Sequence, residues 1–254
     1  MVSREASGDV LAIVTARGGS KGIPGKNVRE VGGHPLIAYS VAAGLAAETV
    51  NRVIVSTDDA AIADIARAYG AEIPFMRPAE LAADDTPDLP VFQHALSWLE
   101  AHDAYKPALV VHLRPTSPLR QTRDIDRAVR VLQDPRFAEA DAVRGVCAPF
   151  QNPYKMWRIA GDGYMVPLME HEMAEPYNQP HQLLPPVYWQ TGYIDVARAR
   201  TIRDMGSMTG RRIAPLVLDH DSWIDIDTIE ALRYADFLLR AGVDGVAVPR
   251  RQVE

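Results

Sequence analysis

A glycine-rich, basic segment near the start of the chain has the residue types that bind phosphate. Residues 15–27 read T-A-R-G-G-S-K-G-I-P-G-K-N and directly follow the apolar run from Val10 to Thr15. Glycine lets backbone N–H groups approach an anion closely, and nearby cations neutralise the anion's charge. The segment therefore predicts a phosphate-binding loop in which Arg17 and Lys21 act on the phosphates. The other nucleotide contacts expected in this loop are Ala16, Gly18, Gly19, Ser20, Gly22, Lys26 and Asn27.

Other glycine-rich motifs match this loop less well. A Walker A loop requires Ser or Thr after its lysine, and Lys26 is followed by asparagine. A dinucleotide-binding G-x-G-x-x-G pattern is absent from the segment. The spacing Gly18-x-Ser20-x-Gly22 does match the nucleophile elbow of serine hydrolases, which needs a helix immediately after the serine. Pro24 argues against such a helix, so a serine hydrolase remains a minor alternative, together with a flexible basic surface turn.

Two aspartates near the end of the chain have the spacing of a metal site. Residues 223–227 read W-I-D-I-D, which predicts a short strand with alternate side chains on opposite faces. Asp225 and Asp227 would then lie on one face, a few ångströms apart, and would repel each other unless a cation lies between them. Mg²⁺ bound to a triphosphate takes oxygen ligands and uses one or two carboxylates. A magnesium–triphosphate site is therefore predicted, and a solvent-facing edge strand with incidental acids is the alternative.

Short β-branched runs alternate with amphipathic segments along most of the chain. Such apolar runs are typical of buried parallel strands, and the segments between them place apolar residues on one helix face. Asp58 is expected to cap the helix that follows it. The expected strands are 10–15, 52–56, 109–113, 142–146, 187–196 and 212–218, and the expected helices are 35–47, 59–69, 90–101, 122–133 and 228–241.

This alternation predicts an α/β fold with a mostly parallel, doubly wound sheet and helices on both faces. The whole chain, 1–254, is expected to form one domain. From about 149 to 187 the helical period is lost and prolines, glycines and aromatic residues appear, which predicts an irregular or β-rich excursion. That excursion is the candidate segment for dimerisation or acceptor binding. The tail from 243 to 254 is expected to be poorly ordered.

Five ordered motifs resemble those of the acylneuraminate cytidylyltransferases (CMP-sialic acid synthetases). They are the loop A-R-G-G-S-K-G-I-P-G-K-N, V-S-T-D from Val55, R-P-A-E-L-A from Arg77 with Asp85 close behind, R-P-T-S-P-L-R from Arg114, and I-D-I-D-T from Ile224. The resemblance covers nearly the whole chain. It implies a nucleotidyltransferase (Rossmann-like) architecture, a nucleoside triphosphate donor, Mg²⁺ and a homodimer, and it adds Arg77 and Asp85 to the nucleotide-binding residues.

The reaction implied by the resemblance is transfer of CMP from CTP to a sialic-acid-like sugar acid, a nonulosonate or a related compound. An acceptor hydroxyl would attack the α-phosphorus and pyrophosphate would leave, as in enzymes of the EC 2.7.7 class. Such a transfer needs charge neutralisation and alignment more than covalent chemistry. No general base can be assigned from the residues.

The motifs expected to face the acceptor depart from the sialic acid pattern. Arg114 replaces the family's glutamine before P-T-S-P, and Thr191 replaces the asparagine of its Asn-Gly step. The histidine at 181 and the tryptophan at 189 replace basic residues. The identity of the acceptor therefore stays open, with Lys155 a candidate for its carboxylate and an ordinary surface lysine the alternative. The residues expected to bind the acceptor are Arg114, Thr116, Ser117, Lys155, Gln182, Gln190 and Thr191.

Composition narrows the possible partners and location. The formal net charge of −6 argues against general attraction to nucleic acid or to an anionic membrane. The single cysteine, Cys147, excludes an intrachain disulfide framework and a cysteine-rich zinc site. No apolar stretch has the length of a spanning helix or of a signal h-region, so the cytoplasm is the expected location.

Two further functions remain open at this point. A related enzyme could load GTP onto a sugar phosphate, because the choice of base depends on backbone contacts that sequence does not display. A non-catalytic nucleotide-sensing module is the other possibility, and the presence of Lys21, Asp225 and Asp227 argues against it.

Overall fold

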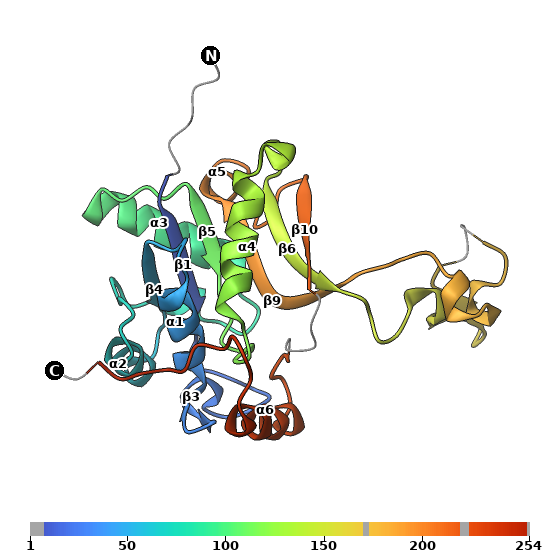
Figure 1. Ribbon diagram of the computed structural model, residues 1–254, viewed down its shortest axis with the longest axis horizontal. Helices are drawn as coiled ribbons and strands as arrows, with labels where there is room; N and C mark the ends of the chain where they lie inside the picture. The colour runs from blue at the N-terminus through green and yellow to red at the C-terminus, as the bar shows by residue number, and fades with distance from the viewer. Residues whose placement is uncertain (1–7, 170–172, 219–223, 253–254) are drawn as a thin grey trace, which may run out of the picture. The chain divides into compact units, whose positions relative to one another are not determined.

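The computed structural model describes residues 8–169, 173–218 and 224–252. Its main sheet has six strands in the order β10-β6-β9-β5-β1-β4 and is shown in Figure 1. The strands are β1 (Val10–Thr15), β4 (Arg52–Ser56), β5 (Leu109–His112), β6 (Ala142–Cys147), β9 (Trp189–Arg198) and β10 (Ile213–Val217).

Strand β1 lies next to the edge strand β4, between β4 and β5, and runs parallel to both of these neighbours. Ala12 pairs with Val53 of β4 on one side and with Val111 of β5 on the other. The chain passes from β1 to β4 and then returns to the opposite side of β1 to form β5, so the strand order reverses at β1. In open α/β sheets, ligands bind outside the carboxyl ends of the strands at such a reversal. The residues after β1 and β5 are therefore the ones that the topology brings to a binding site.

Helices cover both faces of the sheet, as predicted for a doubly wound fold. Helix α1 contacts α4, whereas α3 contacts α5 (Figure 1). The core between α3 and the sheet includes Phe92 and Leu96 of the helix, packed with Leu11 and Ile13 of β1. The helices are α1 (Leu36–Ala46), α2 (Ala60–Ala68), α3 (Asp88–Asp103), α4 (Thr122–Gln133), α5 (Ala199–Arg203) and α6 (Ile229–Ala241).

A second, smaller core anchors the segment that carries the aspartate pair. Ile226 is fully buried there with Ile23 from the glycine-rich loop and Leu232 from α6. The hairpin of β2 (Glu30–Val31) and β3 (His34–Pro35) contributes Val31 to the same core. Packing of Ile23 and Ile226 together holds the glycine-rich loop close to the aspartates, although about 200 residues separate them in sequence.

Residues Val146–Gln190 form a compact unit of their own within the chain. The unit contains an antiparallel hairpin in which Trp157 pairs with Pro167 and Ile159 pairs with Met165. Lys155 donates hydrogen bonds to two backbone carbonyls of the same unit, at 2.8 and 3.2 Å. Its elements are β7 (Trp157–Ile159), β8 (Met165–Pro167), η4 (Pro153–Lys155), η5 (Pro176–Asn178) and η6 (His181–Leu183), whereas η1 (Lys26–Val28), η2 (Ala79–Leu81) and η3 (Pro135–Phe137) belong to the rest of the chain.

Three local expectations are wrong. Residues 224–227 form no strand, because Ile226 pairs its N–H with the Thr116 carbonyl and its carbonyl with Lys26 rather than with a neighbouring strand. Helix α2 is capped by Asp59 rather than Asp58. The tail from 243 is expected to be poorly ordered, but its described part, residues 243–252, is bonded to the body through Gly245 and Gln252 at 3.1 and 2.8 Å.

Candidate active site

A pocket of about 220 Å³ opens at the carboxyl ends of β1 and β5. Its walls come from the glycine-rich loop after β1, the R-P-T-S-P motif after β5 and the first residue of α3. This is the place that the reversal of strand order at β1 predicts for a ligand. The lining residues are Thr15, Arg17, Gly19, Ser20, Lys26, Asn27, Asp88, Arg114, Pro115 and Thr116.

The glycine-rich loop is held in shape by neighbouring side chains. Gly18 donates its N–H to Asp58 Oδ1 at 3.0 Å, and a Cβ at Gly18 would come within 2.8 Å of Asp59. Gly25 has φ of +64°, a conformation that costs other residues strain. Asn27 donates its side-chain amide to the Arg17 carbonyl at 3.0 Å. The glycines therefore serve close approach and turn geometry, and Asp58 ties the loop to the end of β4.

The two cations expected to act on phosphate share one carboxylate partner. Arg17 Nη2 lies 2.9 Å and Lys21 Nζ lies 2.6 Å from Asp84. The hydrogen bond from Lys21, with the charge of Arg17, holds the pKa of Asp84 below its usual value. Asp84 thus occupies the position of an anion between the two cations. A phosphate in the place of this carboxylate would engage both Arg17 and Lys21.

Lys26 links the loop to the aspartate pair. Its ammonium donates to the Ile226 carbonyl at 2.9 Å and to Asp227 Oδ1 at 3.2 Å. Desolvation by surrounding atoms raises the pKa of Asp225, and the charge of Asp227 raises it further. A hydrogen bond from Thr116 opposes the shift, and the exposure of the Asp225 side chain to solvent limits it. Asp225 is therefore bonded to Thr116 and Asp227 to Lys26, and both of these partners line the pocket.

The donor set of this pair suits a hard divalent cation bound to a triphosphate. Two carboxylates, one of them disfavoured in its charged form by burial and by its neighbour, gain most from an added positive charge. Such oxygen ligands, completed by phosphate oxygens, are those that Mg²⁺ takes in nucleotide sites. Asp225 and Asp227 therefore fit the metal that the resemblance implies.

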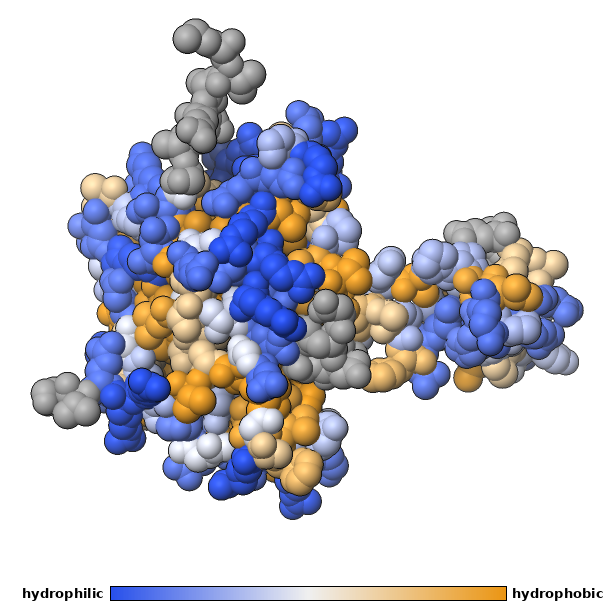
Figure 2. Space-filling view, in the orientation of Figure 1, coloured by the Kyte–Doolittle hydropathy of each residue, from blue (hydrophilic) through white to orange (hydrophobic). Residues whose placement is uncertain are grey.

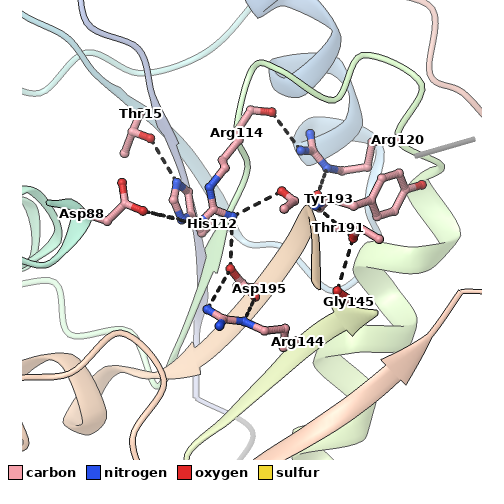
Figure 3. A network of polar contacts seen from close by, with 11 residues as sticks. Thr15, Asp88, His112, Arg114, Arg120, Arg144, Gly145, Thr191, Tyr193 and Asp195 are labelled. Carbon is pink, nitrogen blue, oxygen red and sulfur yellow. Dashed lines mark hydrogen bonds and ion pairs between the residues drawn. The ribbon is translucent and has the colours of Figure 1, made fainter. Parts of the chain in front are cut away.

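Arg114, which lines the pocket, belongs to a network of charged side chains (Figure 3). Arg114 donates to Asp88 at 3.3 Å, to Asp195 at 3.1 Å and to the Gly192 carbonyl at 3.2 Å. Arg144 donates to the other oxygen of Asp195 at 2.8 Å. Asp195 comes into this network because β9 pairs antiparallel with β5 and sets it opposite His112.

Arg120, the last residue of the R-P-T-S-P-L-R motif, fixes the loop that follows β5. It is fully buried, and burial lowers its pKa to about 10. Its guanidinium donates to the carbonyls of Tyr193 and Arg114 at 2.7 and 2.9 Å and to Ser40 at 2.8 Å. These bonds hold the backbone of the motif against β9 and α1, and so set where Arg114 and Thr116 face the pocket.

Comparison with known proteins identifies the family. Residues 11–157 match the model of a family described as cytidylyltransferase. The chain is 32% identical to the CMP-N,N'-diacetyllegionaminic acid synthase of Legionella pneumophila, over 86% of this chain and 91% of that protein. The chain belongs to the cytidylyltransferase family. It is therefore a nucleotidyltransferase, and the pocket at β1 and β5 is its candidate active site.

Two further similarities agree with this assignment. The chain is 40% identical to the N-acylneuraminate cytidylyltransferase of Escherichia coli, over 86% of this chain and 49% of that protein. A solved structure of CMP:2-keto-3-deoxy-manno-octonic acid synthetase complexed with CTP shares the fold, with a TM-score of 0.65 at 15% identity, covering 92% of this chain and 99% of that one. The nucleotidyltransferase fold predicted from the five motifs is confirmed.

The structure brings some of the predicted site residues of this cytidylyltransferase to the pocket and places others behind it. Arg77 is buried and donates to Ser56 at the end of β4. Burial lowers the pKa of the Arg77 guanidinium. Thr191 is buried with its hydroxyl on the Gly145 carbonyl at 3.2 Å. These two residues support the strand ends rather than line the pocket. The pocket lining also leaves out Ala16, Gly18, Lys21, Gly22, Asp85, Ser117 and the predicted metal ligands Asp225 and Asp227.

Three predicted acceptor residues lie in the unit Val146–Gln190. Lys155 donates its ammonium to the carbonyls of Tyr177 and Gln179. Gln182 and Gln190 are exposed. Their part in acceptor binding stays a prediction.

The serine hydrolase alternative does not fit this cytidylyltransferase. A nucleophile elbow needs an α-helix directly after the serine. After Ser20 the chain makes bends and a turn and then the short 3₁₀ helix Lys26–Val28. Within the described ranges, no histidine forms a hydrogen bond with Ser20. In a separate respect, none of the helices in the described part of the chain is long and apolar enough to cross a membrane.

The sequence interpretation missed the acidic residues that pair with the site's cations. Asp84, Asp88 and Asp195 contact Arg17, Lys21 or Arg114, and none of the three carries a motif of its own. Asp84 directly precedes Asp85, so its place next to the R-P-A-E-L-A motif could have indicated that it belongs to the site. Asp195 could have been found by its place on the strand that pairs with β5.

Proposed function

We propose that the protein transfers CMP from CTP to a sialic-acid-like sugar acid, a nonulosonic acid, with release of pyrophosphate. The supporting observation is the convergence of the basic loop after β1, the R-P-T-S-P motif after β5 and the aspartate pair at one end of the sheet. Relatives named for legionaminic, pseudaminic and N-acylneuraminic acid support this acceptor class.

In the proposed reaction, an acceptor hydroxyl oxygen bonds to the α-phosphorus of CTP while the bond to the pyrophosphate oxygen breaks. Arg17 and Lys21 bind the phosphates after exchanging Asp84 for phosphate oxygens. Lys26 lines the pocket and is anchored by the Ile226 carbonyl, so its charge is fixed in place before the substrate arrives. Cations fixed in this way neutralise charge in the transition state without reorganising.

Asp225 and Asp227 are the residues that would hold Mg²⁺ together with the triphosphate. When bound, the ion would neutralise phosphate charge and help to activate the acceptor hydroxyl. The burial of Ile226 between the two aspartates fixes where their carboxylates emerge.

Pyrophosphate release tests the function directly. The purified protein should release pyrophosphate from CTP in the presence of a nonulosonic acid, and should do so poorly with GTP, ATP or UTP. Release from GTP with a sugar phosphate would instead support the guanylyltransferase alternative. Tight binding of nucleotide with no release under any combination would support the nucleotide-sensing module.

The acceptor should differ from N-acetylneuraminic acid. The residues at 114, 181, 189 and 191 depart from the sialic acid pattern, and Arg114 is engaged with two carboxylates. We expect kcat/KM for N-acetylneuraminic acid to be about tenfold or more below that for a modified nine-carbon acid such as N,N'-diacetyllegionaminic acid. Competition between the two acids for limiting enzyme gives the ratio, and efficient use of N-acetylneuraminic acid would contradict the expectation.

We also propose that the protein is a cytoplasmic homodimer that associates through the unit Val146–Gln190. This short unit exposes many large apolar side chains, among them Phe150, Ile159, Tyr164 and Leu183, and Figure 2 shows hydrophobic residues on its surface. Exposed apolar patches of this kind mark interaction surfaces. A second copy of the chain is the occupant that fits, because the same unit would then cover its apolar residues on both protomers.

Light scattering coupled to size-exclusion chromatography tests the dimer. Ile159 and Met165 are cross-strand partners that are 80% and 57% exposed. The double variant Ile159→Asp/Met165→Asp should therefore convert a wild-type dimer into a monomer. Phe237→Asp, at an exposed position of α6, is the matched control and should leave the mass unchanged. A monomeric wild type, or a double variant that stays dimeric, would rule out this interface.

A further inference from the structure

Arg114 faces the pocket, but its positive charge is already matched within the protein. Its side chain is only 25% exposed and donates to the carboxylates of both Asp88 and Asp195. Asp195 in turn binds Arg144, so that two arginines and two aspartates form one balanced cluster (Figure 3). Hydrogen bonds between charged groups of this kind hold the side chains in a defined geometry. Arg114 is therefore better suited to orient a neighbouring group than to attract an anionic substrate by itself.

Asp88 is the member of this cluster that faces the ligand. Its side chain is 41% exposed and lines the pocket, whereas Asp195 is nearly buried. Asp88 is also the first residue of α3, where the helix dipole favours a negative charge. Arg114 and His112 both lie toward Oδ2 of Asp88, at 3.3 and 3.8 Å. Among the residues that the structure describes, none donates to Oδ1, so this oxygen can accept a hydrogen bond from a ligand.

A buried histidine orients the Thr15 hydroxyl so that its oxygen becomes a second acceptor in the pocket beside Asp88. His112 is 2% exposed, its Nε2 lies 3.0 Å from Thr15 Oγ1, and its Nδ1 has no hydrogen-bond partner within the described ranges. Burial and four nearby arginines hold the pKa of His112 well below its usual value, so the ring is neutral. The carboxylate of Asp88 favours the proton on Nδ1, and Nε2 then accepts the hydroxyl proton of Thr15. The oxygen of Thr15 consequently presents lone pairs to the pocket that it lines.

We propose that Asp88 binds neighbouring hydroxyl groups of a substrate sugar, and that Arg114 positions its carboxylate for this contact. The inference rests on the proposed function and assigns the hydroxyl-recognition part of the same site. A carboxylate accepts two hydroxyl donors at once and repels phosphate and carboxylate groups. Arg17 and Lys26 line the same pocket, so sugar hydroxyls at Asp88 lie next to phosphate at the cations. The sugar is either the ribose of CTP or the polyol of the acceptor.

Kinetics of Asp88→Ala distinguish the two sugars. If Asp88 binds the ribose, wild type should prefer CTP over 2'-deoxy-CTP about ten- to hundredfold in kcat/KM, and the variant should lose most of that preference. If Asp88 binds the acceptor, the preference should persist, and KM for the sugar acid should rise about ten- to hundredfold with little change in kcat. Asp64→Ala, at an exposed aspartate of α2, is the matched control and should leave both parameters unchanged. The proposal is overturned if Asp88→Ala keeps both the CTP preference and the acceptor KM within about twofold of wild type.

A double-mutant cycle tests the positioning role of Arg114. Arg114→Gln should reproduce the specificity change of Asp88→Ala, and the double variant should be no worse than either single variant. Arg114→Lys should recover part of the loss, since it restores one donor to Asp88. Additive losses would show that Arg114 contacts the substrate independently and would reject the positioning role.

Calorimetric titration separates this inference from the proposed function. CTP and 2'-deoxy-CTP are titrated into wild type and into Asp88→Ala without any acceptor, so the ribose contact is measured without turnover. If wild type binds the two nucleotides with equal affinity, the ribose is excluded as the partner of Asp88. If Asp88→Ala then also binds the sugar acid with unchanged affinity, the acceptor is excluded as well and the proposal is rejected. Binding of CTP by a protein that releases no pyrophosphate would reject the proposed function while leaving this comparison valid.

Discussion

Asp225→Asn should lower kcat/KM about a hundredfold or more, and Asp227→Asn should do the same. Asparagine keeps the shape of the side chain and removes its charge, so each substitution weakens the carboxylate pair that would hold Mg²⁺ with the triphosphate. Because both residues serve one ion, the double variant should lose far less than the product of the two single effects.

The same substitutions should not destabilise the fold. The folded-state pKa of Asp225 is raised, first by burial and then by Asp227, so ionising this carboxylate costs folding free energy. That cost is present at neutral pH and disappears as the pH falls through the raised folded pKa. Asp225→Asn should therefore leave the melting temperature unchanged or slightly higher at pH 7, with the difference vanishing in acid.

Three measurements check the aspartate prediction together. Chelation of divalent metal should abolish wild-type activity and added Mg²⁺ should restore it. Calorimetry should show that Mg²⁺ strengthens CTP binding to wild type and not to the double variant. At limiting Mg²⁺, activity should fall with decreasing pH from a higher value than an ordinary aspartate would set, because protons compete with the ion for Asp225, whose pKa is raised in the metal-free protein. Full turnover in excess chelator, or in the double variant, would eliminate the metal site.

Lys21→Ala should reduce turnover about a hundredfold while leaving the protein folded. The Lys21 side chain is 79% exposed and bonds only to Asp84 among the described residues, so its removal leaves no buried group unpaired. Its charge, however, is one of the two that Asp84 balances when nucleotide is absent. Without Lys21, a triphosphate bound in the place of Asp84 would lose part of the charge neutralisation that lowers the barrier to phosphoryl transfer.

Two control variants make the lysine test specific. Lys106→Ala removes a lysine that is 63% exposed, against 79% for Lys21, and that pairs with Glu100 outside the site; it should keep wild-type turnover. Ser20→Ala changes the same loop without changing its charge and should be much milder than Lys21→Ala. Wild-type rates in Lys21→Ala would show that the triphosphate does not use this loop. Complete loss in Ser20→Ala would restore the serine hydrolase alternative.

Sequence patterns determined the order of the helices and strands and the location of the glycine-rich loop that lines the site. The β-branched run of β1 and the apolar face of α4 were placed at their observed bounds, because short-range periodicity reports burial directly. The glycine and lysine content of residues 15–27 identified the basic loop, because the residues that favour phosphate binding are consecutive in the sequence. The alternation of strands and helices then required a parallel sheet with its ligands at the carboxyl ends.

Only the tertiary structure decided which charges meet at the site. Asp84 reaches Lys21 across 63 positions of the chain, and Asp195 reaches Arg114 across 81. Strand pairing and loop packing bring these groups together, and no local pattern records such contacts. The alternation around Ile226 predicted a strand, but its backbone pairs with Thr116 and Lys26 instead. Periodicity shows which side chains are buried, whereas hydrogen-bond partners and neutralising charges depend on residues that are distant in sequence and adjacent in space.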